Sequence, residues 1–579
     1  MKPHRFDNLI LIGLFVAGSF LYFDLHYRYW YHFMEQFVLF LYTNAYFTDL
    51  IHTPGGLTEY LNGALMQFFV LPHVAPAILA LVSGLIAVSA LLFYRRCGYL
   101  FSALWCLVPG FLFWIFPPES LSVPISLLTG LVVALGYTYS LAGYRRFLLA
   151  AGLLTACYLL AAPAHLLAAF LMGFYEISKP GNKQKFVTAL TYLALALLLP
   201  LLAMRTLFVV PMEEAFFSRY LYHPEYPQPL SFRIIGCSLP LLSILLYGLR
   251  KWQSGFKYSR SLCYLLLIGG IALGILYGGR PIEQTYRYDY YARTGNWQKI
   301  IDHAGKHPVK DLNALVYLNL ALSHTNQLGN RQFDFPQAGV SGLIQQDPVT
   351  RLDLIAASEV AWQIGHINSS QRYAFVGVLS SERRVQSRLM TRLVETYLVN
   401  EEYGAAQKYI TILENTLFYR DWARKMRGLL KEDTAGKTPW ITEKRKVNVV
   451  TDNPFDPAKT LPNALGYLLD DHPNNRPALE YALSYLLLYK DLTAFMQYMQ
   501  SAQSLYTKLP IHYQEAICIY YATVESNPEA FSSYGIDRTV YERFIKFCSV
   551  AGNGPKALQQ EFGNTYYYYA QFEETPQRN

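Results

Sequence analysis

The sequence has few charged residues. Asp, Glu, Lys and Arg make up 16% of its 579 residues, while hydrophobic residues make up 53%. Soluble globular chains contain about one quarter charged residues. This chain therefore has too little polar surface to be wholly soluble and too much apolar content to be disordered.

The shortage of charge lies in the first half. Residues 1–280 contain 18 Lys and Arg against 10 Asp and Glu, and the rest of the chain contains 31 residues of each sign. The whole net charge of +8 thus belongs to the first half, where basic residues flank apolar segments. That placement is typical of membrane topology rather than of nucleic-acid binding. We expect a membrane half, a neutral soluble half and no nucleic-acid partner.

Cysteine is also scarce. Five of the seven cysteines lie in or beside apolar segments, and no CxxC or His-Cys spacing is present that would hold a metal. Cys518 and Cys548 lie in the second half, where a disulfide between them requires an extracytoplasmic location. The cysteines therefore indicate small core residues and no metal site.

Apolar runs close to the roughly 20 residues that span a bilayer recur in the first half. They cover 8–23, 75–93, 99–116, 121–141, 186–204, 234–249 and 261–277. The first run has no small-residue cleavage site and continues into an aromatic segment, Asp24 to Trp30. It is therefore predicted to be a membrane anchor rather than a signal peptide.

The segment 147–177 has two interpretations. It is too long for one straight span, and Pro163 interrupts it, so it forms either one span or a pair of shorter helices. A turn at Pro163 places most basic loop residues on one side of the membrane, as cytoplasmic loops require. We therefore predict nine passes, or seven and a re-entrant pair, with the amino terminus in the cytoplasm and residues after Arg280 outside. The predicted inside set comprises Lys2, Arg5, Arg95, Arg96, Arg145, Arg146, Lys179, Lys183, Lys185, Arg250, Lys251, Lys257 and Arg260.

The first outer loop, 24–72, combines acidic residues with aromatic helix-like stretches. After Pro54, apolar residues from Leu57 to Phe69 recur at helical spacing, while Glu59, Asn62 and Gln67 occupy other faces. Such a helix is expected to lie in the membrane interface. The loop also contains Asp24, Glu35 and Asp49, with His26, His32 and His52. A second outer loop, 205–233, contains Arg205, Glu213, Glu214, Arg219 and His223.

The second half is predicted to be helical throughout. Turn-like junctions at Gly295, Gly329, Gly365 and Glu402 are 34, 36 and 37 residues apart, a period typical of tetratricopeptide-like helix pairs. We expect such repeats over 281–433, a polar linker over 434–462 and a further helical domain over 463–579. The predicted fold class is all-α: a polytopic membrane domain over 1–280, followed by a soluble domain of helical repeats.

This organisation resembles that of GT-C type glycosyltransferases, which have a long first outer loop with an acidic residue and interfacial helices. The second half is also similar to an uncharacterised family of bacterial envelope membrane proteins, notably at Tyr373–Val376 and Asn415–Ala423. The GT-C resemblance implies transfer of a sugar from a polyprenyl-phosphate donor at the outer face of the cytoplasmic (inner) membrane. It also implies a carboxylate as base, for which Glu35 and Asp49 are the candidates. Candidate substrate-binding residues are Arg28, Arg205, Arg219 and His223; no cofactor is required, although a divalent metal is compatible.

A second function remains open from the sequence. The first outer loop has no adjacent Asp-Asp or Asp-Glu pair and no Glu-x-Asp. The alternative is a non-enzymatic, membrane-anchored scaffold whose helical repeats bind an envelope protein.

Overall fold

The computed structural model is all-α. Its described residues contain no strand, only an isolated bridge between Ala338 and Val340. The chain divides into two compact units, Met1–Glu283 with Asn415–Phe418, and Gln284–Glu414 with Tyr419–Asn579. The residues described are 3–99, 103–140, 144–179, 184–217, 230–252, 260–279, 282–309, 311–345, 347–381, 385–449, 461–525 and 533–573.

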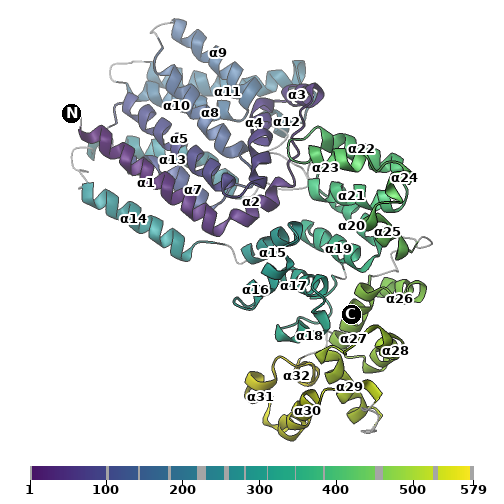
Figure 1. Cartoon of the computed structure of the whole chain (residues 1–579). Coiled ribbons are helices and arrows are strands. Elements are labelled where there is room, and N and C mark those ends of the chain that lie inside the picture. Colours follow the sequence, from purple (N-terminus) through teal and green to yellow (C-terminus); the bar gives the residue numbers. More distant parts are fainter. Residues whose placement is uncertain are drawn as a thin grey trace. The chain divides into compact units, whose positions relative to one another are not determined.

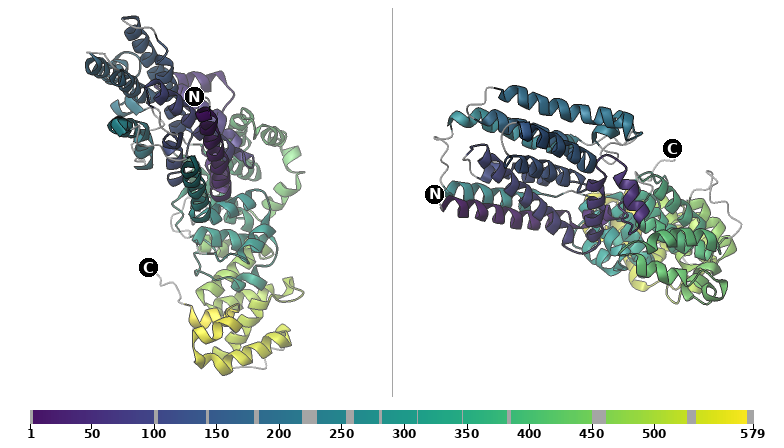
Figure 2. Two further views of the ribbon diagram at one scale, coloured as in Figure 1. Left: turned by 90° about the vertical axis from the view of Figure 1, so that its left-hand side faces the viewer. Right: turned by 90° about the horizontal axis from the view of Figure 1, so that it is seen from above.

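The first unit is a bundle of apolar helices. Helix α10 packs against α8 and α11, while α1 packs against α5 and α14 (Figure 1). The long helices lie side by side (Figure 2, right). Their bounds are α1 Pro3–His26, α5 Val74–Arg96, α6 Ala103–Cys106, α7 Val108–Ile115, α8 Ser122–Tyr137, α9 Tyr144–Ala161, α10 Ala164–Ser178, α11 Lys185–Thr206, α12 Met212–Phe217, α13 Leu230–Gly248 and α14 Arg260–Tyr277.

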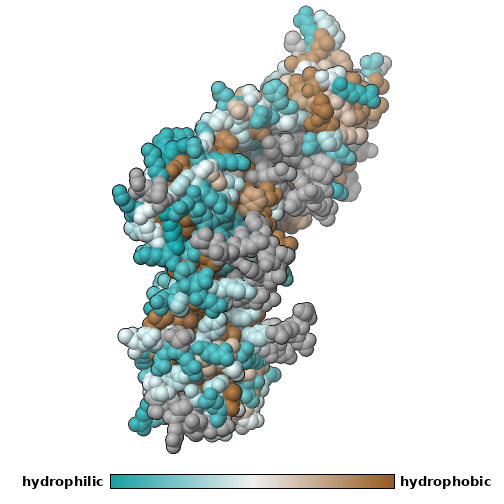
Figure 3. Space-filling model, turned by 90° about the vertical axis from the view of Figure 1, so that its right-hand side faces the viewer, coloured by the Kyte–Doolittle hydropathy of each residue, from teal (hydrophilic) through white to brown (hydrophobic). Residues whose placement is uncertain are grey.

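Four of these helices are long and apolar enough to cross a membrane, namely α1, α5, α9 and α11. Shorter apolar helices include α8 and α10. Leu190, Leu198 and Leu202 of α11 are exposed, and apolar side chains appear in brown on the surface of the first unit (Figure 3). Exposed leucines along a long apolar helix are the pattern expected of a lipid-facing surface. The unit is therefore a membrane-associated domain.

The predicted apolar run 99–116 is not one continuous helix. It contains the short helices α6 and α7, which are separated at Leu107. Pro109 lies in the first turn of α7, where its missing N–H is tolerated, whereas the interior of a long helix would lose a hydrogen bond there. The apolar run therefore contains two short helices, and whether it crosses the membrane stays a prediction.

The segment 147–177 forms two helices, as the interpretation with a turn at Pro163 predicted. Helix α9 ends at Ala161 and α10 begins at Ala164, with Pro163 at the N-cap position. The two helices pack against each other, and both pack against α8. Which side of a membrane this turn faces remains a prediction.

The segment predicted as the first outer loop, 24–72, folds into short helices. These are α2 Arg28–Glu35, α3 Asn44–Ile51, α4 Gly56–Met66 and the 3-10 helix η1 Gln67–Val70. Gly55 precedes α4 with a φ of 77°, and an added Cβ there would lie 2.4 Å from the Ala162 carbonyl oxygen. Glycine therefore allows α4 to begin directly against the α9–α10 turn.

The second unit begins with successive helix pairs. The first pairs comprise α15 Glu283–Arg293 with α16 Trp297–Ala304, α17 Leu312–His324 with α18 Leu328–Arg331, α19 Arg351–Ile364 with α20 Ile367–Leu379, and α21 Ser387–Val399 with α22 Tyr403–Glu414. Each pair turns at a residue with positive φ: Gly295, Asn326, Gly365 and Glu401. Three of these four turns lie at or next to the predicted positions.

Gly329 does not form the turn that the sequence spacing predicted. It lies within α18, and the left-handed residue is Asn326. A Cβ at Gly329 would approach Pro510 Cβ and the Tyr513 ring within 2.8 Å. Close packing of α18 against α29, Ile511–Thr523, explains this glycine.

The segment predicted as a linker, 434–462, is partly helical. Helix α25 spans Pro439–Lys446 and packs against α21. Arg445 Nε donates to the Val399 carbonyl (3.1 Å) and Lys444 Nζ to the Trp362 carbonyl (2.5 Å), so these basic side chains satisfy carbonyls near the ends of α21 and α19. This segment is rich in polar residues because the side chains of α25 form hydrogen bonds to the ends of neighbouring helices. Residues 450–460 lie outside the described part of the chain.

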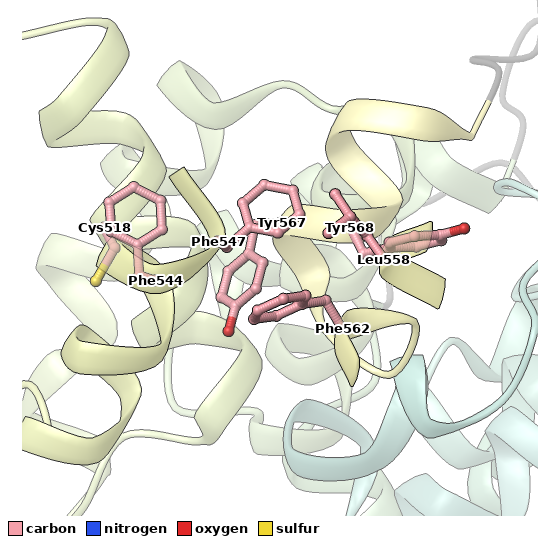
Figure 4. Close-up of a cluster of buried hydrophobic side chains, with 7 residues drawn as sticks. All are labelled: Cys518, Phe544, Phe547, Leu558, Phe562, Tyr567 and Tyr568. Atoms are coloured by element: carbon pink, nitrogen blue, oxygen red, sulfur yellow. The ribbon is translucent and has the colours of Figure 1, made fainter. Parts of the chain in front are cut away.

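The last four helices form an aromatic core. These are α29, α30 Arg538–Val550, α31 Pro555–Phe562 and α32 Tyr566–Phe572, and they follow α26 Leu461–Asp471, α27 Arg476–Tyr489 and α28 Leu492–Ala502. Figure 4 shows the cluster of Cys518, Phe544, Phe547, Leu558, Phe562, Tyr567 and Tyr568. All four residues of the run Tyr566–Tyr569 are buried, so this run closes the core. Cys518 and Cys548 are both free thiols.

Candidate functional site

The two predicted bases have opposite environments. Glu35 is the last residue of α2 and only 3% exposed. Asp49 is in the last turn of α3 and is exposed. A carboxylate held away from water in a membrane domain is a stronger functional candidate than one on the surface, so the structure favours Glu35 over Asp49.

Of the predicted substrate-binding arginines, two are in described parts of the chain. Arg28 begins α2 and forms an ion pair with Asp24, and its Nε donates to Asp24 Oδ1 (2.9 Å). The same Asp24 oxygen contacts His73 Nδ1 (2.7 Å). Arg205 is exposed in the last turn of α11. Arg219 and His223 lie outside the described residues.

Helix α4 turns its polar face toward the protein. Thr58, Glu59 and Asn62 are 2%, 2% and 0% exposed, whereas Leu61 is 43% exposed. The helix was predicted correctly, but its burial differs from that of a helix floating on the interface with only its apolar face buried. Apolar residues outside and polar residues inside are typical of a helix surrounded by lipid, where buried ionisable groups mark functional sites.

Asn62 connects α4 to the start of α8. Its Oδ1 accepts a hydrogen bond from the Leu121 backbone N–H (2.8 Å), and its Nδ2 lies 3.4 Å from Glu59 Oε2. The side chain therefore satisfies an N–H at the helix start while it contacts the buried carboxylate. Glu59 is in this way held beside the first turn of α8.

Three buried hydroxyls lie on the same helices. Thr58 of α4 and Ser122 and Ser126 of α8 have no hydrogen-bond partner within the described ranges. Ser122 and Ser126 are one turn apart and share a face of α8. Gly130 lies one turn further along the same face, where an added Cβ would lie 2.8 Å from the Ala164 carbonyl oxygen. We refer to Thr58, Glu59, Asn62, Ser122 and Ser126 as the α4–α8 polar site.

Close backbone approach holds α4 in this position. A Cβ at Gly63 would lie 3.2 Å from both the Phe40 ring and the Tyr46 hydroxyl. On the next turn, Gln67 Oε1 accepts a hydrogen bond from Tyr42 (3.2 Å). Helix α4 is thus fixed by α3 and the loop before it on one side, and by α8 and α9 on the other.

Glu59 and Asn62 were predicted to lie on non-apolar faces of a helix but were not among the predicted site residues. The available signal was a carboxylate and an amide three residues apart on an otherwise apolar helix, which share one face. The spacing alone does not reveal whether that face meets protein or solvent.

The structure contains no group of three or more His, Cys, Asp or Glu residues with metal-binding geometry in the ranges it describes. His52 Nδ1 contacts the Thr48 carbonyl (2.6 Å) at the end of α3. The hydrogen bonds of the α4–α8 polar site are amide and carboxylate contacts, which suit the binding of hydroxyl groups.

The second unit contains a buried charge network. Arg388 pairs with Asp289 and donates to Glu359 Oε1 (3.1 Å), and Arg392 donates to Glu359 Oε2 (2.7 Å). Burial alone would raise the pKa of Glu359, but Arg392 and Arg388 lower it to about 2. Tyr317 also donates to Asp289 (2.6 Å). The network joins α15, α17, α19 and α21, and its charges compensate one another, which indicates a structural role.

Comparison with known proteins gives one match. A family model described as a family of unknown function, DUF6057, matches residues 5–573. No curated protein and no solved structure matches this chain. The match covers both compact units, so the membrane-associated helices and the second helical unit occur together in the family. The chain therefore belongs to the DUF6057 family.

Proposed function

We propose that this protein is a membrane transferase that moves a sugar from a polyprenyl-phosphate carrier to an acceptor hydroxyl at the outer face of the cytoplasmic membrane. The observation that carries the proposal is the α4–α8 polar site, where Glu59 is buried on a helix whose Leu61 is 43% exposed. Glu35, also buried and also in the first outer loop, is the second candidate base.

The proposed chemistry follows from the residue types. A carboxylate accepts the proton of the acceptor hydroxyl while the acceptor oxygen forms a bond to the anomeric carbon. The bond between that carbon and the phosphate oxygen breaks, and polyprenyl phosphate leaves. Asn62 contacts Glu59 and so orients the carboxylate, and the hydroxyls of Thr58, Ser122 and Ser126 are suited to bonding a polyhydroxylated group.

Charge near the outer end supports the departure of a phosphate. Arg205 at the end of α11 is exposed to such a group, whereas Arg28 is already engaged by Asp24. A guanidinium pairs well with phosphate oxygens because it presents several N–H donors in one plane. We therefore assign the phosphate to Arg205 in preference to Arg28.

The test is transfer from a labelled polyprenyl-phosphate hexose in membranes that contain the protein. Glu59→Gln and Glu35→Gln keep the shape of the side chain but remove the proton acceptor. The variant of the true base should lose about 10²-fold or more in turnover at unchanged protein level. Asp49→Asn is the matched control, because it removes an exposed carboxylate from the same loop.

Two results would contradict the transferase. One is wild-type turnover in the Glu59→Gln, Glu35→Gln double variant. The other is an equal loss in Asp49→Asn, which would show that the loop's overall charge matters rather than a base. A protein that keeps its envelope partners in the double variant and loses them when the helix pairs after Gly295 are deleted would instead be a scaffold.

A further inference from the structure

A second feature of the first unit lies at the ends of its helices. Arg96, the last residue of α5, places its guanidinium 3.7 Å from the centre of the Tyr139 ring, which follows α8. Arg146 in the first turn of α9 contacts Glu176 in the last turn of α10 (3.2 Å) and stacks 4.7 Å above Tyr137. The carboxyl ends of α5, α8 and α10 and the amino end of α9 therefore meet at one end of the bundle.

Two further cations lie at this same end. Lys179, directly after α10, lies 4.4 Å above the Tyr175 ring. Arg250, in the 3-10 helix Leu249–Trp252 that follows α13, donates to the Ser178 carbonyl (3.1 Å). We call this surface the basic end; its described cations are Arg95, Arg96, Arg145, Arg146, Lys179, Lys185 and Arg250.

The basic end carries a net positive charge. Among the described residues at the ends of these helices are seven cations and two carboxylates, Asp7 near the start of α1 and Glu176, and Glu176 is paired with Arg146. Tyrosine rings next to Arg96, Lys179 and Arg146 hold these cations over aromatic faces, so less side-chain freedom is lost when an anion binds. Exposed Leu92 and Phe147 on the adjoining turns offer an apolar surface for acyl chains.

We propose that the basic end binds the phosphate headgroups of anionic phospholipids. Positive charge beside an exposed apolar surface complements an anionic headgroup, and this surface is separate from the transferase site at the other end of α8. Anionic headgroups attract basic residues placed at a membrane surface, each worth about fivefold in binding. Arginines and lysines in this setting contact the phosphate while neighbouring tyrosines remain at headgroup level.

The experiment uses the full-length protein in dodecyl maltoside micelles, titrated with dioleoyl phosphatidylglycerol or dioleoyl phosphatidylcholine. Native mass spectrometry measures how much of each lipid is retained. The wild type should retain phosphatidylglycerol preferentially. The triple variant Arg96→Gln, Lys179→Gln, Arg250→Gln should bind it about 10²-fold more weakly, with phosphatidylcholine binding unchanged.

Helix α13 provides a matched control. Arg250 follows its carboxyl end, whereas Arg233 is exposed near its amino end. Arg250→Gln should weaken phosphatidylglycerol binding about fivefold, and Arg233→Gln should leave it unchanged. The charge-preserving triple variant Arg96→Lys, Lys179→Arg, Arg250→Lys should keep most of the binding.

Three outcomes would overturn the proposal: equal retention of both lipids by the wild type, unchanged phosphatidylglycerol binding in the triple Gln variant, or equal losses in Arg233→Gln and Arg250→Gln. If the triple Gln variant does not fold, the two single variants on α13 decide the question by themselves. Loss of sugar transfer with intact phosphatidylglycerol selectivity would contradict the transferase alone.

Discussion

The charge network around Glu359 allows a quantitative prediction. Glu359→Gln keeps the size of the side chain but removes the charge that Arg388 and Arg392 share. The pKa of Glu359 is about 2 in the folded protein against 4.5 for an ordinary glutamate. That difference corresponds to roughly 3 kcal/mol of stability at pH 7. Because the Glu359 side chain is only 15% exposed, solvent screening reduces this stabilisation only slightly.

The sign of the pH dependence follows from the lowered pKa. The stabilisation that the Glu359 charge provides is fully present above the unfolded-state pKa of 4.5, and it is lost as the pH falls through the folded-state pKa of about 2. By pH 3 it should have dropped to roughly half or less of its neutral value. The difference in unfolding free energy between the wild type and Glu359→Gln should therefore be large at pH 7 and small at pH 3.

Thermal unfolding of the full-length protein in detergent, followed by circular dichroism at both pH values, measures this difference. For a unit of this size roughly 3 kcal/mol lowers the transition temperature by about 6–12 °C at pH 7. Asp421→Asn is the control, since that side chain is 90% exposed and 4.0 Å from Arg424; its effect should stay within about 0.5 kcal/mol. A Glu359→Gln variant as stable as this control, or a stability difference independent of pH, would show that the Glu359 charge does not stabilise the fold.

Three further predictions concern packing and hydrogen bonding, each tested by thermal unfolding in detergent. Gly329→Ala should destabilise the protein by about 1–3 kcal/mol because the new methyl group meets Pro510 and Tyr513 at 2.8 Å. Its control, Gly404→Ala, lies on an open helix surface and should be neutral or stabilising. Equal effects of the two substitutions would contradict close packing at Gly329. Phe562→Ala should cost about 3–5 kcal/mol, since Phe562 is fully buried in the cluster of Figure 4; a loss below about 1 kcal/mol would show that this cluster is not a packed core. Asn62→Ala leaves the Leu121 N–H unbonded and should cost about 1–3 kcal/mol, whereas unchanged stability would mean that another group satisfies that N–H.

Hydrophobic patterning was sufficient to predict the helical fold class and most apolar helices. Pro163 was correctly identified as the break between two helices, because proline removes a backbone donor wherever it occurs. Pro109 likewise lies at a helix start, in the first turn of α7, and the apolar run 99–116 contains the two short helices α6 and α7. Hydropathy averages over a window, so it does not detect a short interruption within an apolar run.

The candidate site shows a different limit. Periodicity predicted the helix around Glu59, but the direction in which its polar face points depends on Leu121 and on the α9–α10 turn, both far away in the sequence. The partners of Glu359, on α21, are likewise 29 and 33 residues distant. The turn at Asn326 was missed because glycine was taken as the marker, although asparagine also adopts the left-handed conformation and Gly329 is needed for packing instead.

We propose that the α4–α8 polar site binds a sugar carried on a polyprenyl phosphate, and lipid retention tests this directly. Purified wild-type protein and the Glu59→Gln variant can each be mixed with a defined polyprenyl-phosphate hexose and with the same polyprenyl phosphate lacking the sugar, and native mass spectrometry then reports the bound lipid. We predict that both proteins retain the hexose-bearing lipid in preference to the bare lipid, and that only the wild type releases bare polyprenyl phosphate when acceptor-containing envelope extract is added. Equal retention of the two lipids by the wild type, with no release on addition of the extract, would contradict the account.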